Sequence, residues 1–298
     1  MTTLLQPAED LDFSPRPRAL WRTLLRKPGF VIPAIVLLGL FVVSIFPGWA
    51  AGFFGHADPR ACDLLNSAAG PSAGHPFGRD VQGCDVYANV IYGTRTSISI
   101  GFLTTTLATL TAAIAGTIAG SIPGVVDAFV SRIMDICLGF PFLLGAIVLL
   151  STVRQRNVAS VSVILALFAW PMMARLVRSS VRSVRALDYV AAGRLIGIST
   201  WRLSTRYVLA NSIAPLVVVA TTTVGAIIVA ESSLTYLGVG LQPPTISWGL
   251  QLAAAQSSFQ QHPHLLIYPA TFLAVTVLCI ITLGDSLRAA LDPKQEHA

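Results

Sequence analysis

The sequence predicts an all-α integral membrane protein, and three observations lead to that class. Hydrophobic residues make up 54% of the chain and charged residues only 11%, about half the charge of a typical soluble domain. The mean hydropathy is +0.69. Apolar runs long enough to cross roughly 30 Å of hydrocarbon as helices recur along the chain. They lack the alternation of barrel strands, so helices must satisfy the backbone within lipid.

Six such runs predict six transmembrane helices. They lie at about 29–50, 97–122, 130–151, 158–177, 212–240 and 265–286. Residues 1–28 form an N-terminal segment, residues 51–96 a long loop and residues 287–298 a tail. Met1 to Pro17 is acidic and contains proline, unlike a cleaved signal peptide, and the first run is long enough to span, so we expect this run to stay as an anchor.

Basic residues predict the orientation. With the N-terminus in the cytoplasm, fifteen of the 20 Lys and Arg residues lie in cytoplasmic segments, and the other five are Arg60, Arg79, Arg95, Arg154 and Arg156. Because Lys and Arg near span ends resist translocation, both termini are expected in the cytoplasm. The same distribution accounts for the net charge of +6 without a nucleic-acid partner.

The predicted external loop, residues 51–96, contains Cys62 and Cys84, whereas Cys137 and Cys279 fall within spans. Disulfides form on the external side of a membrane. The spacing does not show whether the two Cα atoms approach within bonding range. A Cys62–Cys84 disulfide and two unpaired thiols therefore both remain open.

Small and kinking residues predict how the spans pack. Gly116 and Gly120 are spaced for a close helix approach. Pro141 predicts a kink in the third span. Arg132 and Asp135 lie three residues apart on one helical face and are expected to form a structural ion pair near the cytoplasmic end, with a role in transport as the alternative. In the fifth span, Glu231 is expected either as a buried, hydrogen-bonded structural carboxylate or as a group that contacts the solute or a proton.

A polar segment rich in arginine follows the fourth span, which we expect to end near Trp170–Pro171, and residues 178–211 form a loop. Asp188 is the expected N-cap of a short helix there. Its predicted apolar stripe is Val190, Leu195 and Ile198, and Gly197 suits a left-handed helix end. Ser199 or Thr200 can cap the next helix. A short basic helix outside the bilayer suits docking of a soluble partner, whereas a DNA duplex cannot reach it easily between two spans.

This segment resembles the EAA-type loop of ABC-transporter importer permeases. Val190-Ala191-Ala192, Gly197 and Leu209-Ala210-Asn211 occupy the positions of its pattern, with Val190 in place of the usual Glu and Ala210 in place of the usual Pro. Three further blocks resemble signatures of the peptide and nickel permease subfamily, with Arg79 and Cys84 as departures. The blocks are His75–Val86 followed by Ile91–Arg95, Glu231–Gly249, and Gly284–Pro293.

The resemblance implies a type I ABC importer permease with a cytoplasmic coupling helix, namely the C-type subunit of a dipeptide or oligopeptide importer in the bacterial inner membrane. The implied partners are a B-type permease, two cytoplasmic ATPases, an external peptide-binding protein and membrane lipid, but no nucleic acid. ATP and Mg would be held by the ATPases, and this chain would hold no metal or cofactor. The implied ATPase-coupling residues are Asp188, Val190, Ala191, Ala192, Gly193, Arg194, Gly197 and Arg202.

Other function classes remain as alternatives. The sequence lacks a Gly-rich phosphate loop with Lys-Ser/Thr, so we expect no enzyme and no catalytic residues. An ion-coupled secondary transporter or channel acting without an ATPase is the alternative, which inverted repeats or several charges inside the spans would have favoured. A membrane scaffold is a third. Dipeptides, oligopeptides and nickel complexes are all compatible solutes.

Overall fold

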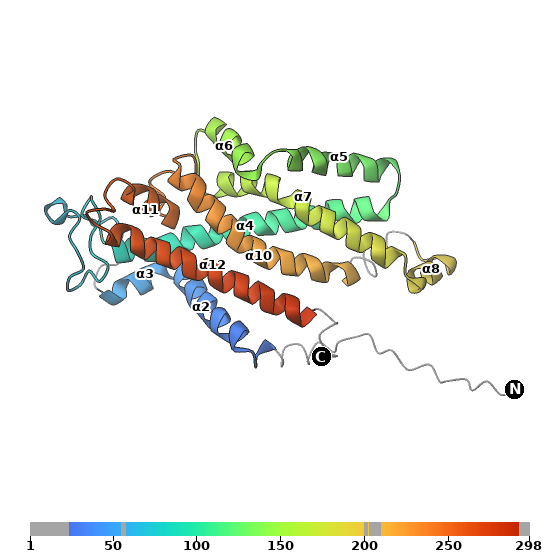
Figure 1. Ribbon diagram of the computed structural model, residues 1–298, viewed down its shortest axis with the longest axis horizontal. Coiled ribbons are helices and arrows are strands. Elements are labelled where there is room, and N and C mark those ends of the chain that lie inside the picture. The colour runs from blue at the N-terminus through green and yellow to red at the C-terminus, as the bar shows by residue number, and fades with distance from the viewer. Residues whose placement is uncertain (1–23, 55–57, 200–201, 203–209, 292–298) are drawn as a thin grey trace.

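The computed structural model describes residues 24–54, 58–199, 202 and 210–291, which form an elongated helical bundle (Figure 1). Five of the described helices are long and apolar enough to cross a membrane, and a bent pair makes a sixth if it is one span. The five are α2 (Pro28–Ile45), α4 (Val86–Ser121), α7 (Val158–Arg185), α10 (Ala210–Tyr236) and α12 (His264–Leu291), and the pair is α5 (Val125–Gly139) with α6 (Phe142–Thr152). The predicted all-helical membrane class is confirmed.

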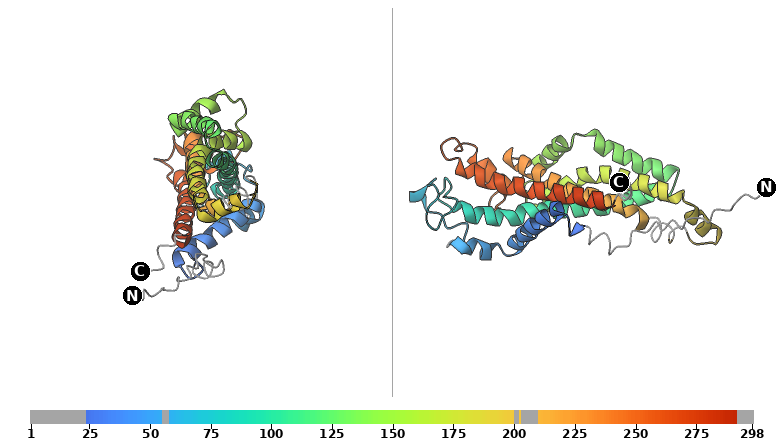
Figure 2. Two further views of the ribbon diagram at one scale, coloured as in Figure 1. Left: turned by 90° about the vertical axis from the view of Figure 1, so that its right-hand side faces the viewer. Right: turned by 60° about the horizontal axis from the view of Figure 1, so that its bottom comes forward.

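The bundle has two distinct ends (Figures 1 and 2). One end, here called the loop end, carries residues 58–85 and the short helices α3 (Pro47–Ala51) and α11 (Trp248–Ala255). The other, the α8 end, carries the short helix α8 (Asp188–Leu195) beyond the end of α7. Helices α4, α7, α10 and α12 run between the two ends, and α2 crosses them at an angle.

The central contact is the packing of α4 against α7, which depends on two glycines. A Cβ atom at Gly116 would lie 2.6 Å from the carbonyl oxygen of Ala174, and one at Gly120 would lie 2.7 Å from the Cβ of Val181. Any side chain there would separate the helices, so the predicted close approach at this pair is confirmed.

Helix α4 begins earlier than the predicted span at residue 97. The Asp85 side chain caps it by accepting hydrogen bonds from the N–H groups of Tyr87 (2.7 Å) and Ala88 (3.2 Å). Its 36 residues give a length of about 54 Å at 1.5 Å per residue, well beyond the hydrocarbon thickness of roughly 30 Å. Residues 86–96 therefore belong to the helix rather than to the connecting loop.

Helix α7 also exceeds its prediction. We expected the fourth span to end near Trp170–Pro171, but the helix continues through the buried Pro171 to Arg185. The arginines beyond the proline find partners on neighbouring helices, and the Arg185 guanidinium donates a hydrogen bond to the carbonyl oxygen of Gly120 at 2.8 Å. Those contacts let a polar segment extend the helix instead of ending it.

The third predicted span is broken rather than continuous. Helices α5 and α6 meet at Phe140–Pro141 with a bend of 86°, so the kink predicted from Pro141 is confirmed and is large. The expected ion pair of Asp135 with Arg132 is wrong, because Asp135 accepts a hydrogen bond from the Arg175 guanidinium at 2.7 Å instead. The extended α7 supplies this partner.

Helix α11 was not predicted, since its eight residues lie in the connection between the last two apolar runs. The Ser247 side chain caps it by accepting a hydrogen bond from the N–H of Leu250 at 3.2 Å. Its first residue, Trp248, is completely buried against α4 and α12. The sequence held one signal for it, because a connection this long without its own structure is uncommon in a compact domain.

Candidate functional site

The α8 helix is the first candidate site, because it projects from the end of the bundle (Figure 1). Asp188 is exposed and lies in the first turn of α8 rather than before it, so the predicted N-cap position is wrong by one residue. A carboxylate in the first turn still favours the helix through the partial positive charge of its N-terminus.

Val190 fixes α8 to the bundle. Its side chain is completely buried in a cluster that includes Met173, Val177 and Val181 of α7 and Ala119 of α4. The buried methyl groups hold α8 against the end of α7, within a cluster that also includes residues of α4.

The predicted apolar stripe of α8 is only partly correct. Ile198 packs at the edge of the cluster that contains Val190, but Leu195 points away and is 89% exposed. Ile196 is 77% exposed and Tyr189 45%. The helix therefore has an inner contact at Val190 and an outer surface that carries large apolar side chains.

Gly197 ends α8 with a φ of +81°. The N–H of Ile198 donates to the carbonyl of Gly193 at 3.1 Å, and the N–H of Ile196 donates to that of Ala192 at 3.1 Å. The first of these bonds, across a left-handed glycine, is the Schellman pattern of helix termination. Gly193 is buried and Ala192 is exposed, so these neighbouring residues lie on the inner and the outer side of α8.

The connection from α8 to α10 is described only in part. The N–H of Arg202, whose side chain is exposed, donates to Ser199 Oγ at 3.4 Å, which fits a helix start at Ser199. Some of the predicted residues lie outside the part that the structure describes. They are Thr200 and Leu209, which belong to residues 200–201 and 203–209, and the side chains of Ala191, Arg194 and Asn211. Ala210 is the first residue of α10.

A charged cluster joins the last turns of α7 to the neighbouring helices, and sequence reasoning missed it. Asp127 is buried in the first turn of α5. It accepts hydrogen bonds from Arg178 Nε at 2.5 Å and Nη2 at 3.0 Å, and a further bond from Arg182. Together with the Arg185 contact to α4, these bonds join α4, α5 and the last turns of α7. An acidic residue in the first turn after Pro123-Gly124 was the available signal.

Glu231 forms the second candidate site, deep inside the bundle. Its side chain is completely buried on α10. Three hydroxyl groups donate hydrogen bonds to it: those of Thr235 at 2.9 Å, Ser232 at 3.3 Å and Ser247 at 3.5 Å. Sequence reasoning identified the carboxylate but not these donors, which lie up to sixteen residues away.

The donors of Glu231 also hold the segment that follows α10. Thr235 Oγ1 accepts a hydrogen bond from the N–H of Leu241 at 3.1 Å, and Ser247 Oγ caps α11. Gly249 permits the approach, since a Cβ atom there would lie 2.9 Å from the Cα of Ser232. One carboxylate thus organises α10, the following loop and the start of α11.

Helix α11 is in turn bound to α4. Trp248 Nε1 donates to the carbonyl oxygen of Val90 at 3.1 Å, and Gln251 Nε2 donates to that of Asn89 at 2.8 Å. Both acceptors lie in the first turns of α4, next to the loop end. The Glu231 network therefore extends to the helix that spans the whole bundle.

The loop end is held by a disulfide and a charged network. The sulfur atoms of Cys62 and Cys84 are bonded, with Cα atoms 4.0 Å apart. Arg79 Nη2 lies 2.8 Å from His75 Nε2, and His75 Nδ1 lies 2.7 Å from Asp85. Because arginine only donates, Nε2 must accept, so Nδ1–H donates to the carboxylate that caps α4.

The disulfide is also supported by Asp80. The Asp80 carboxylate accepts hydrogen bonds from the N–H groups of Gln82 at 2.8 Å and Cys84 at 2.9 Å. Burial raises the pKa of Asp80 above its usual value of 3.8, and these backbone bonds act in the opposite direction. The turn that leads into Cys84 is therefore closely held.

A cleft of 630 Å³ opens between α2, α4, α10 and α12. Most of its lining is aliphatic or aromatic, and its hydroxyl groups come from Thr105, Thr106, Thr109, Thr221 and Thr276. The Thr105 hydroxyl is buried without a hydrogen-bond partner among the described residues. Part of the threonine-rich face of α4 thus lines the cleft, and Thr109 also reaches α7, where its hydroxyl donates a hydrogen bond to Met173 Sδ at 3.7 Å.

Comparison with known proteins extends these observations. Residues 112–297 match the family described as binding-protein-dependent transport system inner membrane component. The glutathione transport system permease protein GsiD of Shigella flexneri is 36% identical over 274 residues, covering 92% of this chain and 89% of that protein. GsiD of Pectobacterium atrosepticum is 32% identical over 277 residues, covering 93% and 91%.

A solved structure shares the fold. The crystal structure of an amino acid ABC transporter with histidines superposes with a TM-score of 0.52 at 14% identity, over 68% of this chain and 94% of that one. The family match covers more than half of the chain, and the relatives match nearly all of it. The chain therefore belongs to the family of binding-protein-dependent transport system inner membrane components.

Proposed function

We propose that this chain is a permease subunit of an ATP-driven importer of short peptides, in which it forms half of the translocation pathway beside a B-type permease. The observation that carries the solute class is the similarity, over more than nine-tenths of the chain, to permeases named for glutathione, which is a tripeptide. Two cytoplasmic ATPases and an external peptide-binding protein complete the proposed complex. The family is a non-catalytic membrane component, so ATP and Mg belong to the ATPases.

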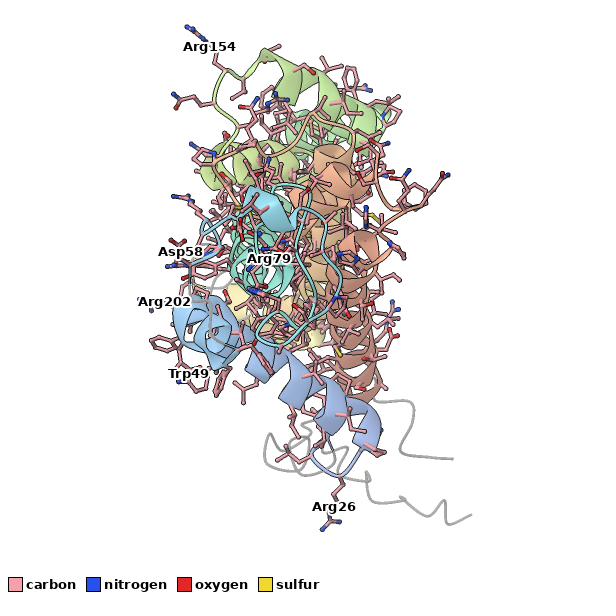
Figure 3. All side chains as sticks on the ribbon, turned by 90° about the vertical axis from the view of Figure 1, so that its left-hand side faces the viewer. Arg26, Trp49, Asp58, Arg79, Arg154 and Arg202 are labelled. Carbon is pink, nitrogen blue, oxygen red and sulfur yellow. A yellow bond between two sulfur atoms is a disulfide. The ribbon has the colours of Figure 1, made fainter. Side chains whose placement is uncertain are left out.

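The proposed orientation puts the α8 end and both termini in the cytoplasm. Basic side chains gather toward that end, where Arg175, Arg178, Arg182 and Arg185 occupy the last turns of α7. Arg79 lies in the loop end, and Arg154 precedes the start of α7, the end of that helix opposite α8; Figure 3 labels both side chains. The positive-inside rule favours this orientation, and an external loop end agrees with the Cys62–Cys84 disulfide.

In the proposed mechanism, α8 transmits the motion of an ATPase to the bundle. The outer surface, with Leu195, Ile196 and Tyr189, is the docking face for the ATPase. Val190 seats α8 in the α4–α7 cluster, so a push on the outer face displaces both central helices. Packed helix ends of this kind switch between discrete arrangements rather than deforming continuously.

The other proposed coupling residues act around this seat. Gly193 allows close packing on the inner side and Gly197 sets the exit of the helix, while Ala192 leaves room on the exposed side. We assign Asp188, Ala191, Arg194 and Arg202 to the same docking region, in line with the EAA-type pattern. Since Val190 occupies the position where Glu is usual, docking here rests on packing more than on a charge pair.

We further propose that Glu231 is a structural carboxylate rather than a group that contacts the solute. Its complete burial and its three hydroxyl donors support this role, because two of the donors, Thr235 and Ser247, also position the segments that follow α10. A carboxylate that binds a passing solute needs access to the pathway.

The test is purification of the chain from native membranes in mild detergent, followed by mass spectrometry and transport in proteoliposomes. A second permease and ATPases are expected to co-purify, and uptake of labelled glutathione and dipeptides is expected to need ATP and the binding protein. Nickel complexes serve as the alternative solute. Uptake by this chain alone, without an ATPase, would instead establish the secondary transporter, and ATP-dependent uptake of nickel but no peptide would overturn the solute class.

A further inference from the structure

Two exposed leucines mark the tip of the loop end. Leu64 and Leu65 belong to a short turn, η2 (Leu64–Asn66), that stands at the outermost part of the bundle (Figures 1 and 3). Leu65 is 95% exposed and Leu64 is 74% exposed. The two leucines are adjacent in the sequence, so together they form a small apolar protrusion that a partner surface can cover. We call this pair the leucine knob.

The knob is held rigid from below. The disulfide fixes Cys62, and Asp63 caps the turn by accepting hydrogen bonds from the Leu65 N–H at 3.1 Å and from the Asn66 amide at 2.7 Å. On the other side, Ser67 Oγ donates to the carbonyl oxygen of Val81 at 2.7 Å. Binding then costs little ordering entropy, because the two side chains are already presented on a fixed backbone.

The cap is ionised at neutral pH. The Asn66 side chain and the Leu65 N–H lower the pKa of Asp63 below its usual value of 3.8. A group with a lowered pKa stabilises the folded turn above that value and loses this effect only as the pH falls through it. The knob therefore keeps its shape over the whole neutral range.

The place of the knob distinguishes a protein partner from lipid. Apolar helix faces for lipid contact lie along the sides of the bundle, as in the exposed Ile32, Ile35 and Leu38 of α2. The knob instead stands beyond the start of α4, at the end of the long axis (Figure 1). A surface in that direction faces the aqueous phase across which a binding protein must approach.

We propose that the leucine knob inserts into an apolar pocket on the surface of the binding protein that serves this permease. The family depends on such a protein, and the knob is a preorganised apolar contact at the end opposite α8. The inference rests on the proposed function, in that it takes the loop end as external. A few such buried side chains typically carry most of the binding energy of an interface.

The direct test replaces Leu65 with p-benzoylphenylalanine in the assembled transporter. Illumination is expected to cross-link this chain to the binding protein. The same probe at Leu195 is expected to cross-link to an ATPase and not to the binding protein. Cross-linking of position 65 to the partner permease or to lipid alone would overturn the proposal.

The quantitative test is the double variant Leu64→Ser/Leu65→Ser in proteoliposomes. The concentration of binding protein that half-maximally stimulates ATP hydrolysis is expected to rise by about tenfold or more, the range for loss of an interface hot spot. Basal hydrolysis, subunit composition and the Cys62–Cys84 bond should not change. The control is Leu144→Ser, another leucine, 59% exposed on α6.

The outcomes separate the two proposals. If the double variant assembles and its half-maximal concentration of binding protein is unchanged, the proposed role of the leucine knob is refuted and the proposed function is not. Failure of wild-type protein to assemble with any ATPase refutes the proposed function.

Discussion

Replacement of Val190 provides the sharpest test of how α8 is attached. The side chain is completely buried in the cluster that contains residues of α7 and α4. Val190→Ala removes two methyl-sized groups, a loss of about 1.6 kcal/mol at about 0.8 kcal/mol each, and the residual cavity raises the cost to about 2 kcal/mol or more. The equilibrium between seated and released α8 should therefore shift toward release by about 30-fold.

Hydrogen exchange measures this shift directly. The N–H groups of Ile196 and Ile198 are bonded to the carbonyls of Ala192 and Gly193, so they exchange when the end of α8 opens. In Val190→Ala, a peptide covering residues 188–198 should exchange faster by up to about 30-fold, with less solute transported per ATP hydrolysed. Val190→Glu, which restores the residue usual at this position of the EAA-type pattern, should release α8 further because it would bury a carboxylate in an apolar cluster.

The matched control is Leu195→Ala on the exposed face of the same helix. We expect unchanged exchange in residues 188–198 but weaker ATPase binding, since this side chain lies on the proposed docking face. Equal exchange in wild type and Val190→Ala would refute the attachment of α8 through this residue. Faster exchange in Leu195→Ala would refute the division into inner and outer faces.

Three further changes probe the interior. Glu231→Gln keeps an acceptor for Thr235 and should lower peptide uptake only modestly. Glu231→Ala should destabilise the complex by about 3 kcal/mol in thermal unfolding. Complete loss of uptake in a normally assembled Glu231→Gln variant would point to a pathway role. Gly116→Val should lower the stability of the bundle by about 1–3 kcal/mol, because the new side chain overpacks against α7. The control is Gly139→Val, where a Cβ atom meets open space. Equal melting temperatures of the two variants would contradict the close approach of α4 and α7. Asp127→Asn should lower the melting temperature by an amount equivalent to about 1–3 kcal/mol, a range that allows for the partial exposure of the arginine partners of Asp127. The same variant should reduce ATP-coupled uptake. Wild-type behaviour in both assays would show that the cluster is dispensable.

Hydropathy predicted the helices that face lipid but not those that face protein. The start of α4 contains Asn89, Thr94 and Arg95, so its mean hydropathy falls although Thr94 is completely buried. Asn89 and Thr94 face protein, since the Asn89 carbonyl accepts a hydrogen bond from Gln251 of α11 and the Thr94 hydroxyl donates to the carbonyl of Val90, whereas Arg95 is exposed. Helix α11 was missed for the same reason, because eight residues held by Glu231 and α4 need no long apolar run.

Local patterns were more reliable than pairings between helices. The spacing of Gly116 and Gly120 predicted the α4–α7 contact, because backbone approach depends on the absence of side chains. The predicted partner of Asp135 was wrong. Arg132, three residues away, competes with Arg175 on α7, and the sequence does not show how close α7 lies to Asp135. Similarly, helical periodicity grouped Leu195 with Val190 although only the position of α7 decides which of them is buried.

The length of α4 gives the bundle a mechanical property. One continuous rod of about 54 Å begins beside the disulfide-bonded loop and ends where the Arg185 guanidinium meets the carbonyl of Gly120. A tilt of about 5° about one end of a rod this long displaces the other end by about 5 Å, close to one helical turn. A small tilt at the loop end would thus move the α8 end by about one helical turn, the distance of a ratchet step between packed helices, without any bending of the rod.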